Sequence, residues 1–292
     1  MKWLFLGTAL ALSPGIALAE GRAEVVGRYA FAEKIPYFGG FSAVEFSEDG
    51  QQFVALSDSA VLFSGSVNRD DAGTILGVML AGGGAALRDE AGAELQDPWD
   101  DSEGLALLPD GDLMISFELR NRVARYTADG QLLQTLPDSI FATVMGNWGL
   151  EALAVDTDGA LFAMAEGDSQ GIDEIPVWRF ADGAWSEAFR LPEDHTWRPV
   201  GADFGPDGRL YLLERDFWGF IGFMTRIRRI SLEADKVTGD EILFRSNAGH
   251  YGNAEGLSVW QDAAGQIRLT LVTDNNFTPT LVQEFIDLRV SD

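Results

Sequence analysis

Five segments of this 292-residue chain repeat one pattern, in which an apolar run typical of a strand leads through a tight turn into a second such run. The repeats are anchored at residues 42, 103, 151, 201 and 255, so successive units lie 61, 48, 50 and 54 residues apart. Repeats of about 40 to 50 residues are typical of β-propellers, whose four-stranded blades surround a central channel. We therefore expect an all-β chain that forms a single β-propeller.

Asp-Gly pairs mark four of the turns, at Asp49, Asp110, Asp158 and Asp207. An Asp-Gly pair between two apolar runs is a strong signal for a β-hairpin. We expect type I′ turns here, with positive φ at both central residues.

The repeat does not fix the number of blades. We predict five or six blades, each of four strands. The long first step contains the glycines 82–84 and the acidic stretch 97–101, which we interpret as a surface loop or as a degenerate extra blade. The last unit is one strand short of four, and the N-terminal residues 23–31 can supply the missing strand and close the ring. A β-sandwich would not explain five similar units at this spacing.

Acidic residues recur at two positions of the repeat. The first position precedes an apolar run and holds Glu103, Glu151 and Glu255, whereas Ser42 and Val200 replace the acid in the other units. The second position ends the second run and holds Asp58, Glu118, Glu166 and Asp274. In the fourth unit Arg215 aligns at this position, with Glu214 one residue before it and Asp216 one residue after it. Equivalent residues of a radial repeat reach one level of the ring, so we expect these side chains to converge at the channel mouth.

Carboxylates that converge repel one another unless cations neutralise them, and their hard oxygen atoms suit Ca²⁺. We predict Ca²⁺ as a cofactor, with ligands drawn from Asp58, Glu103, Glu118, Glu166, Glu214, Asp216, Glu255 and Asp274. The alternative is structural, because an acid after a strand can accept backbone N–H bonds and tie one blade to the next.

Arginines near the acidic positions can bind an anionic substrate. Arg120 and Arg215 each follow an acidic residue at the end of a second run, and a guanidinium there can hold a phosphate or carboxylate. An ion pair between blades is the alternative. Arg226, Arg228 and Arg229 lie along one run, and we expect them to form a solvated face.

Composition narrows the classes of function. The formal net charge is −25, which disfavours nucleic-acid binding because phosphate backbones would be repelled. The chain has no Cys, so disulfides, zinc ribbons and thiol nucleophiles are excluded, and its two His are too few for a His-rich metal site. Serine-hydrolase and nucleotide-binding motifs are absent from the sequence.

The N-terminus has the pattern of a secretory signal peptide. Lys2 precedes the apolar run 3–12, and Ala17-Leu18-Ala19 fits a cleavage site. We expect residues 1–19 to be removed and residues 20–292 to form the propeller domain, a periplasmic or secreted monomer that does not insert into the membrane.

Several motifs together resemble one family of exported bacterial proteins. They are Glu103-Gly104-Leu105-Ala106, Leu150-Glu151-Ala152-Leu153, Glu214-Arg215-Asp216-Phe217, Asn253-Ala254-Glu255-Gly256 and Asp274-Asn275-Asn276-Phe277. In this order they resemble the phytase-like family, often described by an esterase-like activity of phytase. The resemblance implies a propeller with repeated acids and a phosphoester hydrolase activity.

Three functions follow as hypotheses. The first is a Ca²⁺-assisted hydrolase of phosphate esters, with Glu103, Glu151, Glu255 and Arg215 as catalytic residues and Arg120, Arg215 and Asn275 as substrate-binding residues. The second is a lactonase-type hydrolase with Ca²⁺ held by Glu103, Glu255 and Asn275. The third is a non-catalytic binding or scaffold propeller of the cell envelope, whose acids are structural.

Overall fold

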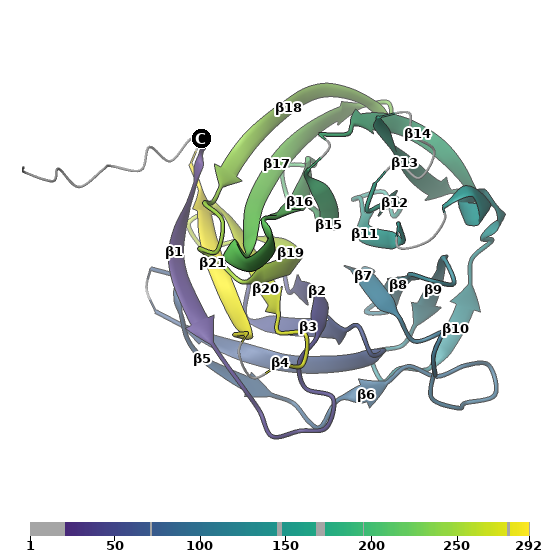
Figure 1. The fold of residues 1–292 in the computed structure, drawn as a ribbon, viewed down its shortest axis with the longest axis horizontal. Coiled ribbons are helices and arrows are strands. Elements are labelled where there is room, and N and C mark those ends of the chain that lie inside the picture. Colours follow the sequence, from purple (N-terminus) through teal and green to yellow (C-terminus); the bar gives the residue numbers. More distant parts are fainter. Residues whose placement is uncertain are drawn as a thin grey trace, which may run out of the picture.

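The computed structural model describes residues 21–70, 72–144, 148–167, 173–194, 196–278 and 281–291. Within these residues the strands form five antiparallel sheets that surround a central channel (Figure 1). The predicted β-propeller is thus confirmed, with five blades. The predicted signal peptide, residues 1–19, lies outside the described residues.

Blades 1 to 3 come first along the chain. Blade 1 contains β2 (Phe41–Phe46), β3 (Gln52–Ser57), β4 (Val61–Arg69) and β5 (Ile75–Leu80), and the short β6 (Ala85–Ala86) pairs with β4. Blade 2 contains β7 (Ser102–Leu107), β8 (Leu113–Phe117), β9 (Arg122–Tyr126) and β10 (Leu132–Thr135). Blade 3 contains β11 (Leu150–Val155), β12 (Leu161–Ala165), β13 (Glu174–Ala181) and β14 (Ala184–Pro192).

Blades 4 and 5 complete the ring. Blade 4 contains β15 (Arg198–Phe204), β16 (Leu210–Phe217), β17 (Phe223–Glu233) and β18 (Lys236–Arg245). Blade 5 contains β19 (Asn253–Gln261), β20 (Ile267–Asp274), β21 (Glu284–Val290) and β1 (Ala23–Ala30). Two 3-10 helices, η1 (Ser139–Thr143) and η2 (Gly219–Ile221), lie in connections between strands.

The ring is closed by pairing the two ends of the chain. β1 runs antiparallel to β21, from Ala23 opposite Val290 to Ala30 opposite Glu284 (Figure 1). The N-terminal strand therefore completes the last blade, as predicted. The long first repeat step is explained by the segment between β5 and β7, which contains only β6 and no further blade among its residues.

The Asp-Gly hairpins are confirmed, but their turn type differs from the prediction. Gly50, Gly111, Gly159 and Gly208 have positive φ, whereas the preceding aspartates do not. In the first turn the Gly50 N–H donates to the Ser47 carbonyl, so the glycine follows a type I turn instead of lying inside a type I′ turn.

The hydrophobic core lies between neighbouring blades. One cluster joins Phe162 and Met164 of blade 3 to Ala202 and Leu212 of blade 4, and another joins Phe53 of blade 1 to residues of blade 5. The described residues contain no helix with the length and apolar character needed to cross a bilayer.

Candidate functional site

The innermost strand of every blade carries a β-bulge at the same place. In β2, β7, β11, β15 and β19 the register shifts at Ser42, Glu103, Glu151, Val200 and Glu255 respectively. These are the residues of the first recurring position. A bulge leaves its extra residue outside the ladder and re-aims its side chain, so the acids of this position are directed by the bulges.

The residues of the second position lie at the same end of the channel. Asp58, Glu118 and Glu166 donate their backbone N–H groups to the carbonyls of Gly40, Asp101 and Gly149, which lie two residues before the bulge of each blade. Arg215 and Asp274 pair in the same way with Arg198 and Asn253. We call this end of the channel the mouth.

The two positions meet at the mouth, as expected. Electrostatic interactions link residues from blades 1, 2, 3, 4 and 5 into one group, which we call the mouth cluster: Asp58, Asp101, Glu103, Glu118, Glu151, Glu166, Arg215, Glu255 and Asp274. It contains eight carboxyl groups and one guanidinium. The group is therefore short of positive charge when its carboxyls are ionised.

Arg215 bridges the blades on either side of its own. Its guanidinium is hydrogen-bonded to the carboxylate of Glu255, and donates to Asn253 Oδ1 at 3.0 Å and to Glu166 Oε1 at 3.3 Å. Burial alone would lower the pKa of Arg215, but Glu255, Glu151 and Glu166 raise it overall. Asn253 Nδ2 donates in turn to Glu255 at 2.7 Å and Asp274 at 3.3 Å.

Three carboxylates of blade 2 come close enough to share a cation. One oxygen of each of Asp101, Glu103 and Glu118 lies within 4.8 Å of the others. One oxygen of Glu118, Oε1, is buried and has no hydrogen-bond partner. These donors are hard oxygens, which Ca²⁺ prefers, so the residues fit the predicted ion.

Burial raises the pKa of most carboxyl groups of the mouth cluster and so favours their neutral form. Burial raises the pKa of Glu118 to about 7, assisted by the charges of Asp101 and Glu166, and burial raises the pKa of Glu255 to about 7 despite Arg215. Burial likewise raises the pKa of Asp58 to about 6. The pKa values of Glu103 and Glu151 lie well above the usual range because of burial.

Glu214 lies away from the mouth cluster, inside blade 4. It is 2% exposed, and its carboxylate accepts hydrogen bonds from Arg226 Nε at 2.6 Å and from Arg228 Nη1 at 3.0 Å. Arg226, Arg228 and Arg229 are buried, so the prediction of a solvated face was wrong. The reason is that buried carboxylates need guanidinium partners, and β17 provides them beside β16.

Three other predicted residues have separate surroundings. Asp216 accepts a hydrogen bond from the indole N–H of Trp218 at 2.8 Å. The Asn275 side-chain oxygen accepts hydrogen bonds from the backbone N–H groups of Gly40 at 3.0 Å and Phe277 at 3.1 Å, and so caps the turn after β20. Arg120 is exposed, with its guanidinium 5.4 Å from the ring centre of Trp99.

Asp101 is the member of the mouth cluster that was not among the predicted site residues, and it belongs to the acidic stretch 97–101, which we interpreted as a surface loop or a degenerate extra blade. It lies two residues before the bulge at Glu103, at the position of Asn253 in blade 5. An alignment of this third position would have revealed a polar residue in both units.

Below the mouth the channel is closed. Its cavity is about 10 Å³, lined by small and apolar residues such as Ala43, Gly104, Ala202 and Gly256 together with Glu151. This is no more than the space that one water molecule needs, about 10 to 15 Å³, so a phosphate ester cannot pass through the channel at this level. Any ligand therefore reaches the mouth cluster from the mouth side.

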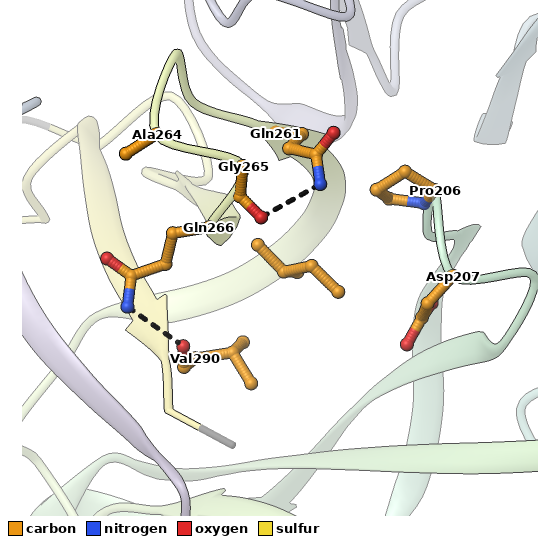
Figure 2. Close-up of a pocket in the computed structure, with 8 residues that line it drawn as sticks. Pro206, Asp207, Gln261, Ala264, Gly265, Gln266 and Val290 are labelled. Atoms are coloured by element: carbon orange, nitrogen blue, oxygen red, sulfur yellow. Dashed lines mark hydrogen bonds between the residues drawn. The ribbon is translucent and has the colours of Figure 1, made fainter.

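A larger pocket lies on the face opposite the mouth and has few ionisable side chains in its lining. Figure 2 shows this cavity of about 490 Å³, between the β15–β16 and β19–β20 turns. Gln261 Nε2 donates to the Gly265 carbonyl at 2.9 Å and Gln266 Nε2 to the Val290 carbonyl at 3.5 Å (Figure 2). Among the described residues that line it, Asp207 alone is ionisable, whereas the mouth cluster gathers nine ionisable groups, so we take the mouth cluster as the candidate site.

Comparisons with known proteins support a family assignment. A family model described as phytase-like, "Esterase-like activity of phytase", matches residues 36–277. This span includes every residue of the mouth cluster. Among curated proteins, none matches the chain.

Solved structures show weaker likenesses. A virginiamycin B lyase from Staphylococcus aureus is 12% identical with a TM-score of 0.46, over 92% of this chain and 100% of the lyase chain. An aldose sugar dehydrogenase from Streptomyces coelicolor is 14% identical with a TM-score of 0.46, over 94% and 100% of the two chains. A gluconolactonase from Xanthomonas campestris is 17% identical with a TM-score of 0.41, over 81% and 68%. Likenesses of this strength carry no argument about chemistry.

Proposed function

The chain belongs to the phytase-like family, and from this premise we propose that it is a Ca²⁺-assisted hydrolase of phosphate esters that acts at the mouth cluster. The observation that carries the proposal is the approach of Asp101, Glu103 and Glu118, whose oxygens lie within 4.8 Å of one another. Their position beside Arg215, at the open end of a closed channel, gives a substrate one direction of approach.

The charge of the mouth cluster explains why a cation is needed. A phosphate ester is an anion, and eight carboxyl groups with one guanidinium would repel it once they are ionised. Asp101, Glu103 and Glu118 would hold Ca²⁺, and the unpartnered Oε1 of Glu118 offers it a free acceptor. When bound, the ion would supply positive charge that polarises a phosphoryl oxygen.

The remaining residues of the mouth cluster have roles that their contacts support. Arg215 offsets the charge of Glu255 and Glu166 and gives a phosphate oxygen a second positive group. Glu255 has a pKa of about 7, so its carboxyl can accept or release a proton near neutral pH. Asn253 holds Glu255 in place through the 2.7 Å hydrogen bond to its carboxylate.

Calorimetric titration with Ca²⁺ tests the cation site. We expect the wild-type protein to bind with a Kd of about 10⁻⁵ M, in the range of sites built from several carboxylates. The variant Glu118→Gln should lose this binding. The variant Asp58→Asn removes another acid of the mouth cluster outside the group of three and should retain it.

Turnover separates the three hypotheses. The wild-type protein should hydrolyse an aryl phosphate with Ca²⁺ and lose this activity in the presence of a chelator. Hydrolysis of a lactone without phosphatase activity would favour the lactonase reading. Tight calcium binding without either activity would leave a binding or scaffold propeller. Absence of calcium binding by the wild-type protein would refute the cation-assisted mechanism.

A further inference from the structure

Large exposed apolar side chains are more numerous on the mouth face of the ring than on the opposite face, where Leu133 and Val237 are exposed beside two of the turns. On the mouth side they include Tyr37, Leu119 and Phe277, which come from the connections of blades 1, 2 and 5. The described turns on the opposite side, such as 47–51, 156–160 and 262–266, expose no large apolar side chain. The two faces of the ring therefore differ in the surface that they offer.

The most prominent apolar element is the hairpin tip that joins β16 to β17. Phe220 is fully exposed, and Phe217, Trp218 and Ile221 are 65%, 53% and 52% exposed. In Figure 1 the green coil of this tip lies beside β19, inward of β1 and β21. Large exposed apolar groups of this kind mark surfaces that contact a partner or a membrane.

The tip is held in a defined conformation. The Trp218 N–H donates to the Gly222 carbonyl at 2.9 Å, and the Gly249 N–H donates to the Phe223 carbonyl at 2.9 Å. The Trp218 indole N–H is bonded to Asp216. The exposed side chains are thus presented by a structured loop, so no ordering is needed when they are buried.

We propose that the mouth face docks on a lipid surface of zwitterionic phospholipids, with the tip of the β16–β17 hairpin inserted among the headgroups. Zwitterionic headgroups carry their ammonium groups outermost, where they would meet a chain with a net charge of −25. The apolar side chains around the mouth reach past the headgroups, as aromatic residues do at membrane interfaces. An anionic surface would be repelled by a chain with a net charge of −25.

A lipid surface fits these observations better than a protein partner does. The exposed groups are separate projections from several connections, with polar residues of the mouth between them. A protein interface has a contiguous buried core, whereas a fluid headgroup layer can close around isolated projections.

Vesicle flotation tests the proposal, with the chain from Glu20 onward, because the apolar run 3–12 would itself bind lipid. This chain includes all the strands of the ring. Phosphatidylcholine–phosphatidylethanolamine vesicles are compared with vesicles that also contain phosphatidylglycerol, in a chelator so that calcium does not bridge protein and phosphate. We expect flotation with the zwitterionic vesicles and weaker flotation when anionic lipid is present.

Two matched variants locate the contact. Phe220→Ser/Ile221→Ser removes two apolar groups from the tip and should lower the partition coefficient at least about tenfold. Leu76→Ser/Met79→Ser removes two groups of similar exposure, 57% and 70%, from the outer strand β5 and should leave it unchanged.

Three results would overturn the proposal. They are failure of the wild-type protein to float, equal losses in the two variants, and a concentration-dependent dimer that is lost in the tip variant, which would assign this face to a second copy of the chain. Because flotation needs no turnover, its failure would leave the proposed hydrolase untouched.

Discussion

The guanidinium of Arg215, near the end of β16, is hydrogen-bonded to the carboxylate of Glu255, the bulged residue of β19 in the next blade. The same guanidinium contacts Glu166 of the preceding blade. One side chain thus links three blades at the point where their carboxylates converge. Both the stability of the ring and the charge of the mouth cluster depend on it.

Replacing Arg215 by Met should destabilise the protein by about 3 kcal/mol at pH 8, because buried carboxylates lose their partner. The loss should be smaller at pH 5, since raised pKa values let the carboxyls take up protons there. Urea unfolding at the two pH values measures this. Arg289→Met, which removes an exposed pair with Glu24, is the control and should cost less than about 1 kcal/mol. Equal losses in the two variants would contradict the bridging role.

The free energy of unfolding should fall as the pH rises from about 4 to 8. The cause is a pair of buried acids at the other end of the channel, which lose their protons over this range. Glu45 of blade 1 accepts a hydrogen bond from Ser258 at 3.3 Å, and Asp203 of blade 4 accepts one from the Val259 N–H at 2.6 Å. Burial raises the pKa of Asp203 to about 7, and burial together with the charge of Asp203 raises the pKa of Glu45 well above its usual range.

The direction of this change in stability follows from proton binding by the folded and unfolded states. The folded state binds these protons more tightly than the unfolded chain, so their contribution is complete below about pH 4 and is lost as the pH passes through about 7. Urea midpoints between pH 4 and 8 should decline, and the decline should be shallower in Glu45→Gln/Asp203→Asn. Parallel profiles for the variant and the wild-type protein would exclude this pair as a source of the pH dependence.

Glu214→Ala should destabilise the protein by about 3 to 5 kcal/mol, because Arg226 and Arg228 would be left buried without their shared carboxylate. Calcium affinity should not change, since Glu214 lies outside the mouth cluster. Thermal unfolding and calorimetry measure the two effects. The control Glu187→Ala removes a surface pair with Arg190 and should cost less than about 1 kcal/mol. Weakened calcium binding in the Glu214 variant would restore it as a candidate ligand.

Gly149→Ala should weaken calcium binding at least about tenfold, in line with the loss of groups that orient a metal ligand. A Cβ at this glycine would lie 2.2 Å from Cγ and 2.6 Å from Cβ of Glu118, so Glu118 would have to move. Calorimetry gives the affinity. Gly77→Ala is the control, because a Cβ there meets nothing within 4 Å. Unchanged affinity in the Gly149 variant would show that the position of Glu118 is not needed for binding.

Much of the fold could be predicted from local signals. Each hairpin is specified by a turn residue and two apolar runs, which lie within about twenty residues of one another. The blade count could not be predicted, because residues 81–101, which make the first step the longest, are compatible from their sequence with a surface loop or with a degenerate blade. Their strand pairing, which consists of β6 on β4, is a tertiary contact.

The candidate site could be predicted in part. Repetition placed the acids of both positions at one end of the ring, and the structure brings eight of the predicted residues, among them Glu103, Glu118 and Arg215, into the mouth cluster. Glu214 and Arg215 are neighbours on one strand, so their side chains point to opposite faces. Which of the two faces the mouth depends on the register of β15, β16 and β17, and adjacency in the sequence cannot decide it.

The repeat, the hairpins, the strand that closes the ring and the acidic character of one end could all be predicted before the structure, because each depends on residue types at a regular spacing. The tertiary structure decided the number of blades, the bulges that aim Glu103, Glu151 and Glu255, the inclusion of Asp101 and the bridge of Arg215 across three blades. These features depend on the radius of the closed ring and on register between strands, which are set by contacts between residues far apart in the chain.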